Sequence, residues 1–414
     1  MGGGLLQLVA YGAQDVYLTG NPQITFFKVV YRRHTNFALE SIQQTFNGSV
    51  GYGQRVTATI SRNGDLISRA YLVLGVGSTA TTLCPYFGLR AIKHAEVEIG
   101  GQRIDKHYAD WMYIWNELSM PVGKKEGYFE MVGGKGGDLS GKSLYVPLEF
   151  WFCRNIGLAL PLIGLQYHEV KVNIQFEEEN NVGANTTEEN AAAAGTLSAS
   201  LWVDYIYLDT DERRKFAQSS HEYLIEQLQF TGRESASNKI KLNFNHPVKE
   251  LVWVVHQAAN DASNTTATNQ NNRNWFNFTA DPDALTKSTD TDYASLSKVL
   301  GPSGAATNGV TLGKLILNGN DRFYARDGRY FSLVQPFQHH ENVPNNVGIN
   351  VYSFALKPEE HQPSGSLNMS RIDTAVLDLQ YNSGTTGGKQ VSIFAVNYNV
   401  LRILSGMGGI AYSN

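Results

Sequence analysis

Residues 136–143 have the sequence GGDLSGKS, which matches the pattern of a nucleotide-binding phosphate loop. In such a loop, Lys142 would contact the phosphates and Ser143 would bind a magnesium ion. This chemistry needs a buried strand before the loop and a helix after it, because the amides at the helix N-terminus bind the phosphates. Here a strand-like segment that contains Pro147 follows the loop. We therefore predict no nucleotide site, and an ATPase would have to show nucleotide binding that Lys142→Ala abolishes.

Histidines and carboxylates, which often perform catalysis or bind metals, show no spacing typical of a site. The ten histidines form neither an HExxH motif nor an H-x-H pair. His339, His340 and Glu341 are adjacent, but neighbouring residues on a strand point to opposite faces. Asp209 and Asp211 lie in a charged stretch that we interpret as a solvated connector. We predict no catalytic residue, no metal site and no cofactor, so the protein is not expected to be an enzyme.

Asparagines in the N-glycosylation motif N-x-[ST] are the remaining candidate sites. Asn185 lies in the polar insertion 177–196, and Asn264 and Asn277 lie in the Asn- and Thr-rich segment 258–283. Such composition cannot bury enough apolar surface to form a core, so both segments should project from the surface. Asn185, Asn264 and Asn277 are therefore the candidate glycosylation sites. Two further copies of the motif, where exposure is less expected, occur at Asn47 and Asn368.

The composition of the 414-residue chain limits the partners it can have. With 34 basic and 38 acidic residues the net charge is −4, which argues against a protein that grips nucleic-acid phosphates. The two cysteines, Cys84 and Cys153, are too few for a disulfide framework and are expected to be free thiols in a reducing compartment. No apolar run approaches the roughly 20 residues of a membrane-spanning helix, so we expect a soluble chain without a transmembrane segment.

Three stretches of the first half of the chain recur in the second half in the same order. Each pair repeats its pattern of apolar and polar positions at an offset of roughly 200 residues, which indicates a duplicated domain. Two long copies differ from a solenoid, whose short units need about three neighbours to bury a core. The junction lies in the aromatic strand and charged connector of residues 201–232. The pairs are FALESIQQT (37–45) with YLIEQLQFT (223–231), EIGGQR (98–103) with LNGNDR (317–322), and EVKVNIQF (169–176) with TAVLDLQY (374–381).

Short strands separated by turns dominate the rest of the pattern. Asn63-Gly64 between two strand-like segments predicts a two-residue hairpin. Two tryptophans and a leucine at helical spacing predict a helix over 111–119. Residues 123–143 are expected to be a Gly-rich loop, and the aromatic run RYFSLVQPF (329–337) is expected to be a further strand. Many short strands with little helix indicate a sandwich or barrel in each half.

The N-terminal residues 1–25 are predicted to form an arm, because their small and apolar residues show no sustained period. A cluster of basic residues follows this arm. A basic cluster usually faces water, and its functional interpretation is contact with an acidic partner or an anionic surface. Its members are Lys28, Arg32, Arg33 and His34.

Stretches spread over nearly the whole chain resemble the major capsid proteins of large icosahedral double-stranded DNA viruses, most closely those of algal viruses such as the chloroviruses. They include QLVAYGAQDVYLTGNPQITFFKVVYRRHTNF, IGGQRIDKHYADW, WVDYIYLDTDERRKFAQ, QPSGSLNMSRID and NYNVLRILSGMGGIAY. The resemblance implies an all-β double jelly roll, in which two tandem eight-stranded β-sandwiches carry short helices in their loops. Together with the duplication, it predicts an arm at 1–25, a first jelly roll at 26–213 and a second jelly roll at 214–414.

The resemblance also implies a structural function. Three chains would form a homotrimeric capsomer of pseudo-hexagonal outline, and neighbouring capsomers would tile the icosahedral capsid of a virion assembled in the host cytoplasm. The arm would lie on the inner face near minor capsid proteins and an internal membrane, and outer loops would carry N-linked glycans. No direct contact with nucleic acid is expected. The alternative is a carbohydrate-binding, lectin-like jelly roll, which would need an exposed aromatic platform or a calcium-binding carboxylate cluster.

Overall fold

The computed structural model describes residues 4, 7–24, 29, 31–77, 83–182, 195–257, 275–280, 307–382 and 388–413. The chain divides into two compact units, Met1–Phe37 and Ala38–Asn414. In the first unit, helix α2 (Val16–Thr19) buries no side chain. Arg32, Arg33 and His34 of the basic cluster are exposed there, and Lys28 lies outside the described residues.

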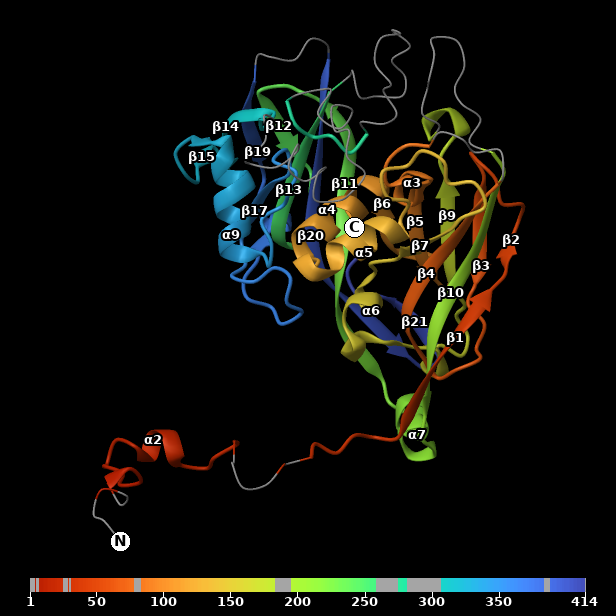
Figure 1. Cartoon of the computed structure of the whole chain (residues 1–414), viewed down its shortest axis with the longest axis vertical. Coiled ribbons are helices and arrows are strands. Elements are labelled where there is room, and N and C mark those ends of the chain that lie inside the picture. Colours follow the sequence, from red (N-terminus) through yellow and green to blue (C-terminus); the bar gives the residue numbers. More distant parts are fainter. Residues whose placement is uncertain are drawn as a thin grey trace. The chain divides into compact units, whose positions relative to one another are not determined.

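Two sheets form the first half of the second unit (Figure 1). Neighbouring strands in one sheet follow the order β1-β10-β4-β7, with the short β8 beside β4, and in the other the order β2-β3-β9-β5-β6. The strands of the first sheet are β1 (Phe37–Gln44), β4 (Leu66–Val76), β7 (Ser143–Pro147), β8 (Leu160–Pro161) and β10 (Leu197–Leu208). Those of the second are β2 (Phe46–Asn47), β3 (Arg55–Thr59), β5 (Ile92–Ile99), β6 (Gln102–Tyr108) and β9 (Val170–Phe176).

Two further sheets form the second half. One has the order β11-β20-β13-β17, with β18 beside β13 and β21 beside β20; the other has the order β12-β19-β14-β15, with β16 beside β14. The strands of the first are β11 (His221–Ser235), β13 (Pro247–Gln257), β17 (Asn350–Ser353), β18 (Leu367–Asn368), β20 (Lys389–Leu404) and β21 (Met407–Ile410). Those of the second are β12 (Lys239–Leu242), β14 (Val310–Leu317), β15 (Asn320–Asp321), β16 (Arg326–Asp327) and β19 (Ala375–Tyr381).

The two halves repeat the same topology. When the main strands of a half are counted from one to eight along the chain, its sheets have the orders 1-8-3-6 and 2-7-4-5 in both halves. Two such sheets make a jelly roll, so the predicted double jelly roll is confirmed. The recurring stretches occupy equivalent strands, β1 with β11 and β9 with β19. The equivalent hairpin turns have positive φ at both central residues, Gly100 and Gly101 in one half and Asn318 and Gly319 in the other.

Helices occupy connections between strands. The helix predicted for 111–119 is confirmed as α4 (Ala109–Ser119). Residues 123–143 are not a loop throughout, because α5 (Val122–Met131) covers their first part. The run RYFSLVQPF is not a strand: it forms the π-helix η6 (Tyr330–Val334) and α9 (Gln335–His339), whose first turn contains a proline. The other helices are α3 (Phe87–Arg90), α6 (Trp151–Arg154), α7 (Thr210–Gln218), η1 (Ile156–Leu158), η2 (Leu162–Gly164), η3 (Glu179–Asn181) and η7 (Met369–Arg371).

The segment around Asn63-Gly64 is not a hairpin. It joins β3 to β4, but β3 pairs with β9 whereas β4 pairs with β10 and β7, so the segment crosses from one sheet to the other. A Cβ at Gly64 would lie 2.8 Å from the Cβ of Tyr205 on β10. The glycine therefore allows the crossing segment to pass close to the sheet. The hairpin prediction had instead assumed that the glycine was needed for a two-residue turn.

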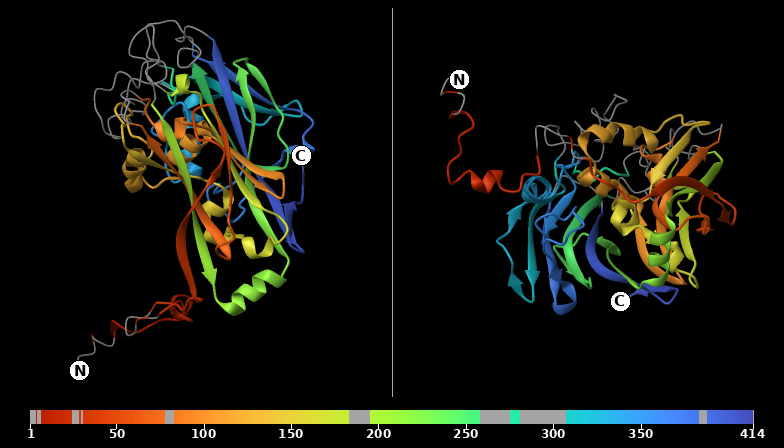
Figure 2. Two further views of the ribbon diagram at one scale, coloured as in Figure 1. Left: turned by 90° about the vertical axis from the view of Figure 1, so that its right-hand side faces the viewer. Right: turned by 90° about the horizontal axis from the view of Figure 1, so that it is seen from below.

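The cores explain why the second unit includes both jelly rolls. Leu251 and Trp253 of β13 face the core of the second sandwich, whereas Val252 and Val254 face a cluster that continues into the first sandwich. One sheet of the second half is thus buried on both faces. The two halves lie side by side, with this sheet next to the first half (Figure 2).

Two segments that the sequence predicts to project each bury some of their residues. Glu177 and Val182 are buried at the start of the polar insertion. Phe276 and Phe278, in the Asn- and Thr-rich segment, are 2% and 0% exposed. The prediction of surface loops is wrong for these residues, and residues 183–194 and 258–274 lie outside the described ranges.

Candidate functional site

The phosphate-loop match leads into a strand, as its sequence context predicts. β7 begins at Ser143 and pairs with β4 in an antiparallel sheet. The side chain of Lys142 is exposed, and its carbonyl accepts a hydrogen bond from the backbone N–H of Val76. A Cβ at Gly136 would lie 2.3 Å from the carbonyl oxygen of Leu83, so this glycine permits close packing of two chain segments. The match therefore lies outside the strand–loop–helix arrangement that binds phosphate.

Asp209 and Asp211 belong to an exposed connector, as predicted. The carboxylate of Asp209 accepts a hydrogen bond from the backbone N–H of Thr210 at 2.8 Å and caps α7. Asp211 lies in the first turn of the same helix, where a negative charge is favoured by the helix dipole. Both carboxylates therefore stabilise the start of the helix that connects the two halves.

The candidate glycosylation sites differ in their surroundings. Asn185 and Asn264 lie outside the described residues. Asn277 is 0% exposed, and its side-chain oxygen accepts hydrogen bonds from the backbone N–H and the hydroxyl of Thr279, at 3.1 and 2.7 Å. The exposure expected for Asn277 is not found, because the phenylalanines on either side of it anchor the segment in the core.

The two cysteines are free thiols, as expected. Burial raises the pKa of Cys84 to about 12. Burial also raises the pKa of Cys153. Because the thiolate is the reactive form, both residues are poor nucleophiles.

A charged cluster joins the two halves at Glu226 on β11. One carboxylate oxygen of Glu226 lies 2.7 Å from the Nζ of Lys249, a fully buried residue of β13. The other accepts a hydrogen bond at 3.1 Å from Arg154, which belongs to α6 of the first half. The guanidinium of Arg154 also lies 4.0 Å from the centre of the Trp115 ring on α4, a cation–π contact. Burial lowers the pKa of Lys249, while the charge of Glu226 works in the opposite direction.

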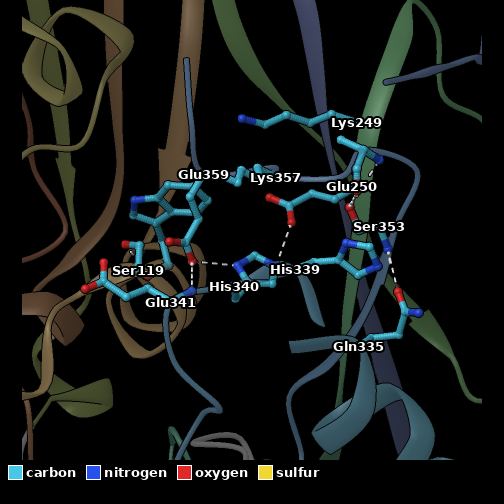
Figure 3. Close-up of polar contacts among 12 residues, drawn as sticks. Ser119, Lys249, Glu250, Gln335, His339, His340, Glu341, Ser353, Lys357 and Glu359 are labelled. Carbon is cyan, nitrogen blue, oxygen red and sulfur yellow. Dashed lines mark hydrogen bonds and ion pairs between the residues drawn. The ribbon is translucent and has the colours of Figure 1, made fainter. Parts of the chain in front are cut away.

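His340 continues this cluster and lies between two carboxylates (Figure 3). Its Nε2 is 3.0 Å from Glu250, and its Nδ1 is 2.7 Å from Glu359. Burial works to lower the pKa of His340, but the two carboxylates outweigh burial and raise it to about 9. Burial would raise the pKa of Glu250, but His340 and Lys249 hold it below its usual value. The imidazole is therefore protonated at neutral pH. Its Nδ1 donates a hydrogen bond to Glu359, and its Nε2 forms an ion pair with Glu250.

A cavity of about 760 Å³ lies beside this cluster. Residues of both halves line it, from α4 and α6 on one side and from α9 and residues 357–360 on the other. Charges of both signs face it, so the cavity favours neither an anion nor a cation. The charged residues are Lys124, Arg154, His340 and Lys357 and, opposite in sign, Glu149, Glu341, Glu359 and Glu360.

The charge of His340 predicts a loss of stability in alkali. Its pKa is raised from 6.5 to about 9 by folding, so its stabilising contribution is complete below about pH 6.5 and is lost as the pH rises through about 9. The shift corresponds to about 3 kcal/mol. Denaturant titrations should therefore give a difference in free energy of unfolding between the natural chain and His340→Gln that shrinks from pH 7 to pH 10. A difference that stayed constant over this range would contradict the charged imidazole.

A second buried cluster centres on Asp110, at the start of α4. One carboxylate oxygen of Asp110 accepts a hydrogen bond from Trp275 Nε1 at 2.8 Å. The other lies 3.3 Å from Arg233 and 3.5 Å from His256. The guanidinium groups of Arg90 and Arg233 both lie over the Trp275 ring, 3.5 and 4.3 Å from its centre.

Electrostatics keep Asp110 charged and His256 neutral. Burial would raise the pKa of Asp110, but His256, Arg233 and Arg90 outweigh it and lower the pKa. Burial, followed by the charge of Arg233, lowers the pKa of His256 to about 3. A single carboxylate therefore accepts hydrogen bonds from an arginine and a tryptophan of the second half and holds them against a helix of the first half.

Sequence reasoning did not identify the members of these two clusters as sites. The sequence places His340 and its neighbours on a predicted strand, whereas His340 follows the helix α9 in the structure. The only sequence signal was the proline in RYFSLVQPF, which is favoured in the first turn of a helix. The partners of each cluster are far apart in the chain. Arg154 and Asp110 of the first half meet their partners because the two jelly rolls pack together.

Comparisons with known proteins agree with the fold. A family model described as the N-terminus of the major capsid protein matches residues 25–209, and a model described as the large eukaryotic DNA virus major capsid protein matches residues 212–409. The major capsid protein of Pyramimonas orientalis virus is 54% identical, and that of Paramecium bursaria Chlorella virus 1 is 46% identical, each over the full length of both chains. A chain of the quasi-atomic model of the PBCV-1 virus capsid has a TM-score of 0.79 at 40% identity, covering 94% of this chain and 100% of that chain.

The resemblance inferred from sequence is confirmed by these comparisons. Within the described residues, helices are all too short or too polar to cross a membrane. Buried charged groups form ion pairs between the two jelly rolls at Arg154–Glu226 and Asp110–Arg233. The chain belongs to the family of major capsid proteins of large eukaryotic DNA viruses, which are part of the virion capsid.

Proposed function

We propose that three copies of this chain form one capsomer with six jelly rolls around its axis, and that neighbouring capsomers tile an icosahedral shell. The observation that carries this proposal is the repeat of one strand order in both halves of a single unit. Three such chains supply six similar lobes, so an assembly with threefold symmetry can meet its neighbours around a hexagon. Tiling depends on geometry and requires no catalytic step, which supports a structural and not an enzymatic role.

The purified chain should therefore be a trimer in solution. Light scattering coupled to size-exclusion chromatography should give a mass three times the 45.8 kDa of one chain at micromolar concentration. Obligate interfaces are large, on the order of 2,000 Å² or more, so the trimer should persist on dilution to submicromolar concentration. A monodisperse species of 45.8 kDa would contradict the proposal.

The two jelly rolls divide at Arg213, within α7, so that residues 26–213 and 214–414 form one lobe each. This boundary is supported by the matched ranges of the two family models, which end at 209 and begin at 212. Limited proteolysis should cut first within this exposed connector if the lobes are folding units.

The arm contacts minor capsid proteins on the inner face of the shell. Its apolar side chains support this part of the proposal, because several are exposed in its unit and need a partner surface. The most exposed are Tyr17, Ile24 and Leu18, at 93%, 92% and 84%.

Asn185 and Asn264 carry N-linked glycans, supported by their motif and polar surroundings in the sequence. Asn277 can carry one only if the glycan is added before its segment packs, since its side chain is buried in the folded protein. Glycopeptide mapping of virion protein tests all three positions.

A further inference from the structure

Two segments of the second half reach into the core of the first jelly roll. They are residues 275–280, between β13 and β14, and residues 342–346, between α9 and β17, and we term them the anchor segments. Phe276 and Phe278 in the first of them are buried and belong to the apolar cluster that fills the first sandwich. Asn346 in the second is fully buried. The second half therefore supplies part of the core of the first.

The first anchor segment packs against aromatic rings of the first half. The ring of Phe276 stacks on that of Tyr113 on α4, with centroids 4.8 Å apart, and lies 5.7 Å from the ring of Tyr86 at an angle of 77°. The ring of Phe278 lies 5.9 Å from that of Tyr113. Aromatic pairs of this kind add to the stability that burial alone provides. Without this segment, α4 and Tyr86 would lose apolar cover.

The second anchor segment caps the C-terminal end of α4. The last carbonyl groups of a helix have no partner within the helix. The backbone N–H and the Nδ2 of Asn342 both donate to the carbonyl of Leu118, each at 3.2 Å, and the Nδ2 also donates to the carbonyl of Met120. The backbone N–H of Asn345 donates to the carboxylate of Glu117 at 3.3 Å. The second half thus satisfies polar groups at the end of a helix of the first half.

Asn346 joins the two anchor segments to each other and to the first half. Its Nδ2 donates to the carbonyl of Phe276 at 2.8 Å and lies 3.5 Å from the hydroxyl of Tyr113. A buried amide that loses such partners is costly, because no water replaces them. The two anchor segments are therefore expected to dock together and not one at a time.

The peptide connection between the halves contributes little packing by comparison. It runs through α7, which buries no side chain and lies at one end of the second unit (Figure 1). Arg213 of α7 pairs with Asp65 at 2.8 Å, but the arginine side chain is 55% exposed. Contacts made far from the connection, at the anchor segments, therefore hold the halves together.

We propose that the two jelly rolls are a single folding unit, which the anchor segments hold together, and that the peptide connection at α7 is dispensable once the chain has folded. The first half alone would lack the cover of α4 and Tyr86, and the second half alone would expose the face of β13 that packs on the first. The coupling acts within one chain, so it does not rest on the trimer proposed above. It gives a shell protein tolerance to a cut at its exposed connector.

Hydrogen exchange of the full chain, followed by mass spectrometry, tests the coupling. Phe331 is fully buried in the second sandwich, with its ring 5.1 Å from that of Trp253, in a cluster separate from that of the first sandwich. In a single folding unit, Phe331→Ala should speed the slowest exchange in β3 and β9 of the first half as much as in β14 and β19 of the second, by about a hundredfold. Phe331→Leu is the milder variant should the alanine variant fail to fold.

Two results of this measurement would overturn the proposal. One is exchange in β3 and β9 that stays unchanged while exchange in β14 and β19 speeds up, since the halves would then unfold independently. The other is a coupling that disappears at a lower protein concentration, because it would then act between chains. The same factor in both halves at both concentrations is the expected result.

Cutting the connector tests whether it is dispensable. A protease recognition sequence inserted between Gln218 and Ser219, at the end of α7, allows the folded full chain to be cut there. Denaturing gels should show two fragments, whereas light scattering should give the same mass as before the cut. Fragments that separate without denaturant would overturn the proposal.

Variants of the cut chain show whether the anchor segments provide the attachment. Phe276→Ala combined with Phe278→Ala should release the two fragments after cutting, because the rings that pack on Tyr113 are removed. Asn342→Ala, which removes only side-chain bonds to the end of α4, is the variant to cut should the double variant fail to fold. Ile156→Ala is the control, because Ile156 is 72% exposed, and its fragments should stay together. Anchor variants whose fragments stay together as firmly as those of this control would contradict the role of the anchor segments.

Discussion

Replacing Glu226 by alanine should lower the free energy of unfolding by about 3–5 kcal/mol, the usual cost of removing one partner from a buried ion pair. Lys249 is 0% exposed and its Nζ lies 2.7 Å from Glu226. Without this carboxylate, the fully buried ammonium of Lys249 and the largely buried guanidinium of Arg154 would be two positive charges with no anion between them. Denaturant titration of the purified chain at fixed protein concentration measures the loss.

Glu222→Ala on the same strand is the matched control. Glu222 pairs with Arg402 at 2.9 Å, but both side chains are more than half exposed. An exposed pair contributes little, because water solvates each charge almost as well as the partner does. If Glu226→Ala and Glu222→Ala lowered the free energy of unfolding by similar amounts, the burial of Lys249 would not be the cause of the loss.

The duplicated architecture could be predicted from the sequence because its signals are local. The repeated pattern of FALESIQQT and YLIEQLQFT reflects equivalent edge strands, β1 and β11. The Gly-centred turns occur in both halves because a tight hairpin needs positive φ at both central residues. α4 could be predicted for the same reason, since its period of apolar residues is contained within eleven residues.

The charged clusters could not be predicted, because their members are distant in the chain and ordinary in their surroundings. Lys249 and Glu250 occur in PVKELVW, where charged residues in a strand usually face water. They are buried because the sheet that contains β13 is covered on both faces. This burial depends on how the two jelly rolls pack together and not on the sequence of the strand itself.

The Asn- and Thr-rich composition of residues 258–283 hid a short apolar stretch. WFNFTA, residues 275–280, alternates large apolar with smaller residues, which is a signal of burial that the average composition of the longer segment concealed. Its Trp275 is the residue that Asp110 holds against the first jelly roll.

The two clusters together fix how one jelly roll lies against the other. Apolar packing between Trp111 and Phe394 tolerates small rotations, because dispersion contacts are not directional. Buried charges do not tolerate them, because each must keep its partner at hydrogen-bond distance in a medium of low dielectric constant. If three chains form one capsomer, the fixed angle between the two jelly rolls of a chain also sets the angle between neighbouring chains.

Asp110→Ala should lower the free energy of unfolding by about 3–5 kcal/mol, because two half-buried donors, Arg233 and Trp275, lose their shared acceptor. Arg233 would be left beside Arg90 with no carboxylate between them, and Trp275 would lose the acceptor of its Nε1–H. Asp110→Asn keeps the shape and one acceptor oxygen but not the charge, so its loss should be smaller. Denaturant titration of both variants at neutral pH measures the two values.

The effect of Asp110→Ala should also depend on pH. The folded pKa of Asp110 lies below its usual value, so its stabilising contribution is present above the usual aspartate pKa and is lost as the pH falls through the folded pKa. The difference between the natural chain and Asp110→Ala should therefore be constant from pH 6 to pH 8 and shrink in acid, opposite to the alkaline loss expected for His340. The exposed Asp138, in Asp138→Ala, is the control. A loss for Asp110→Ala no larger than that of this control would show that the carboxylate does not hold the two jelly rolls together.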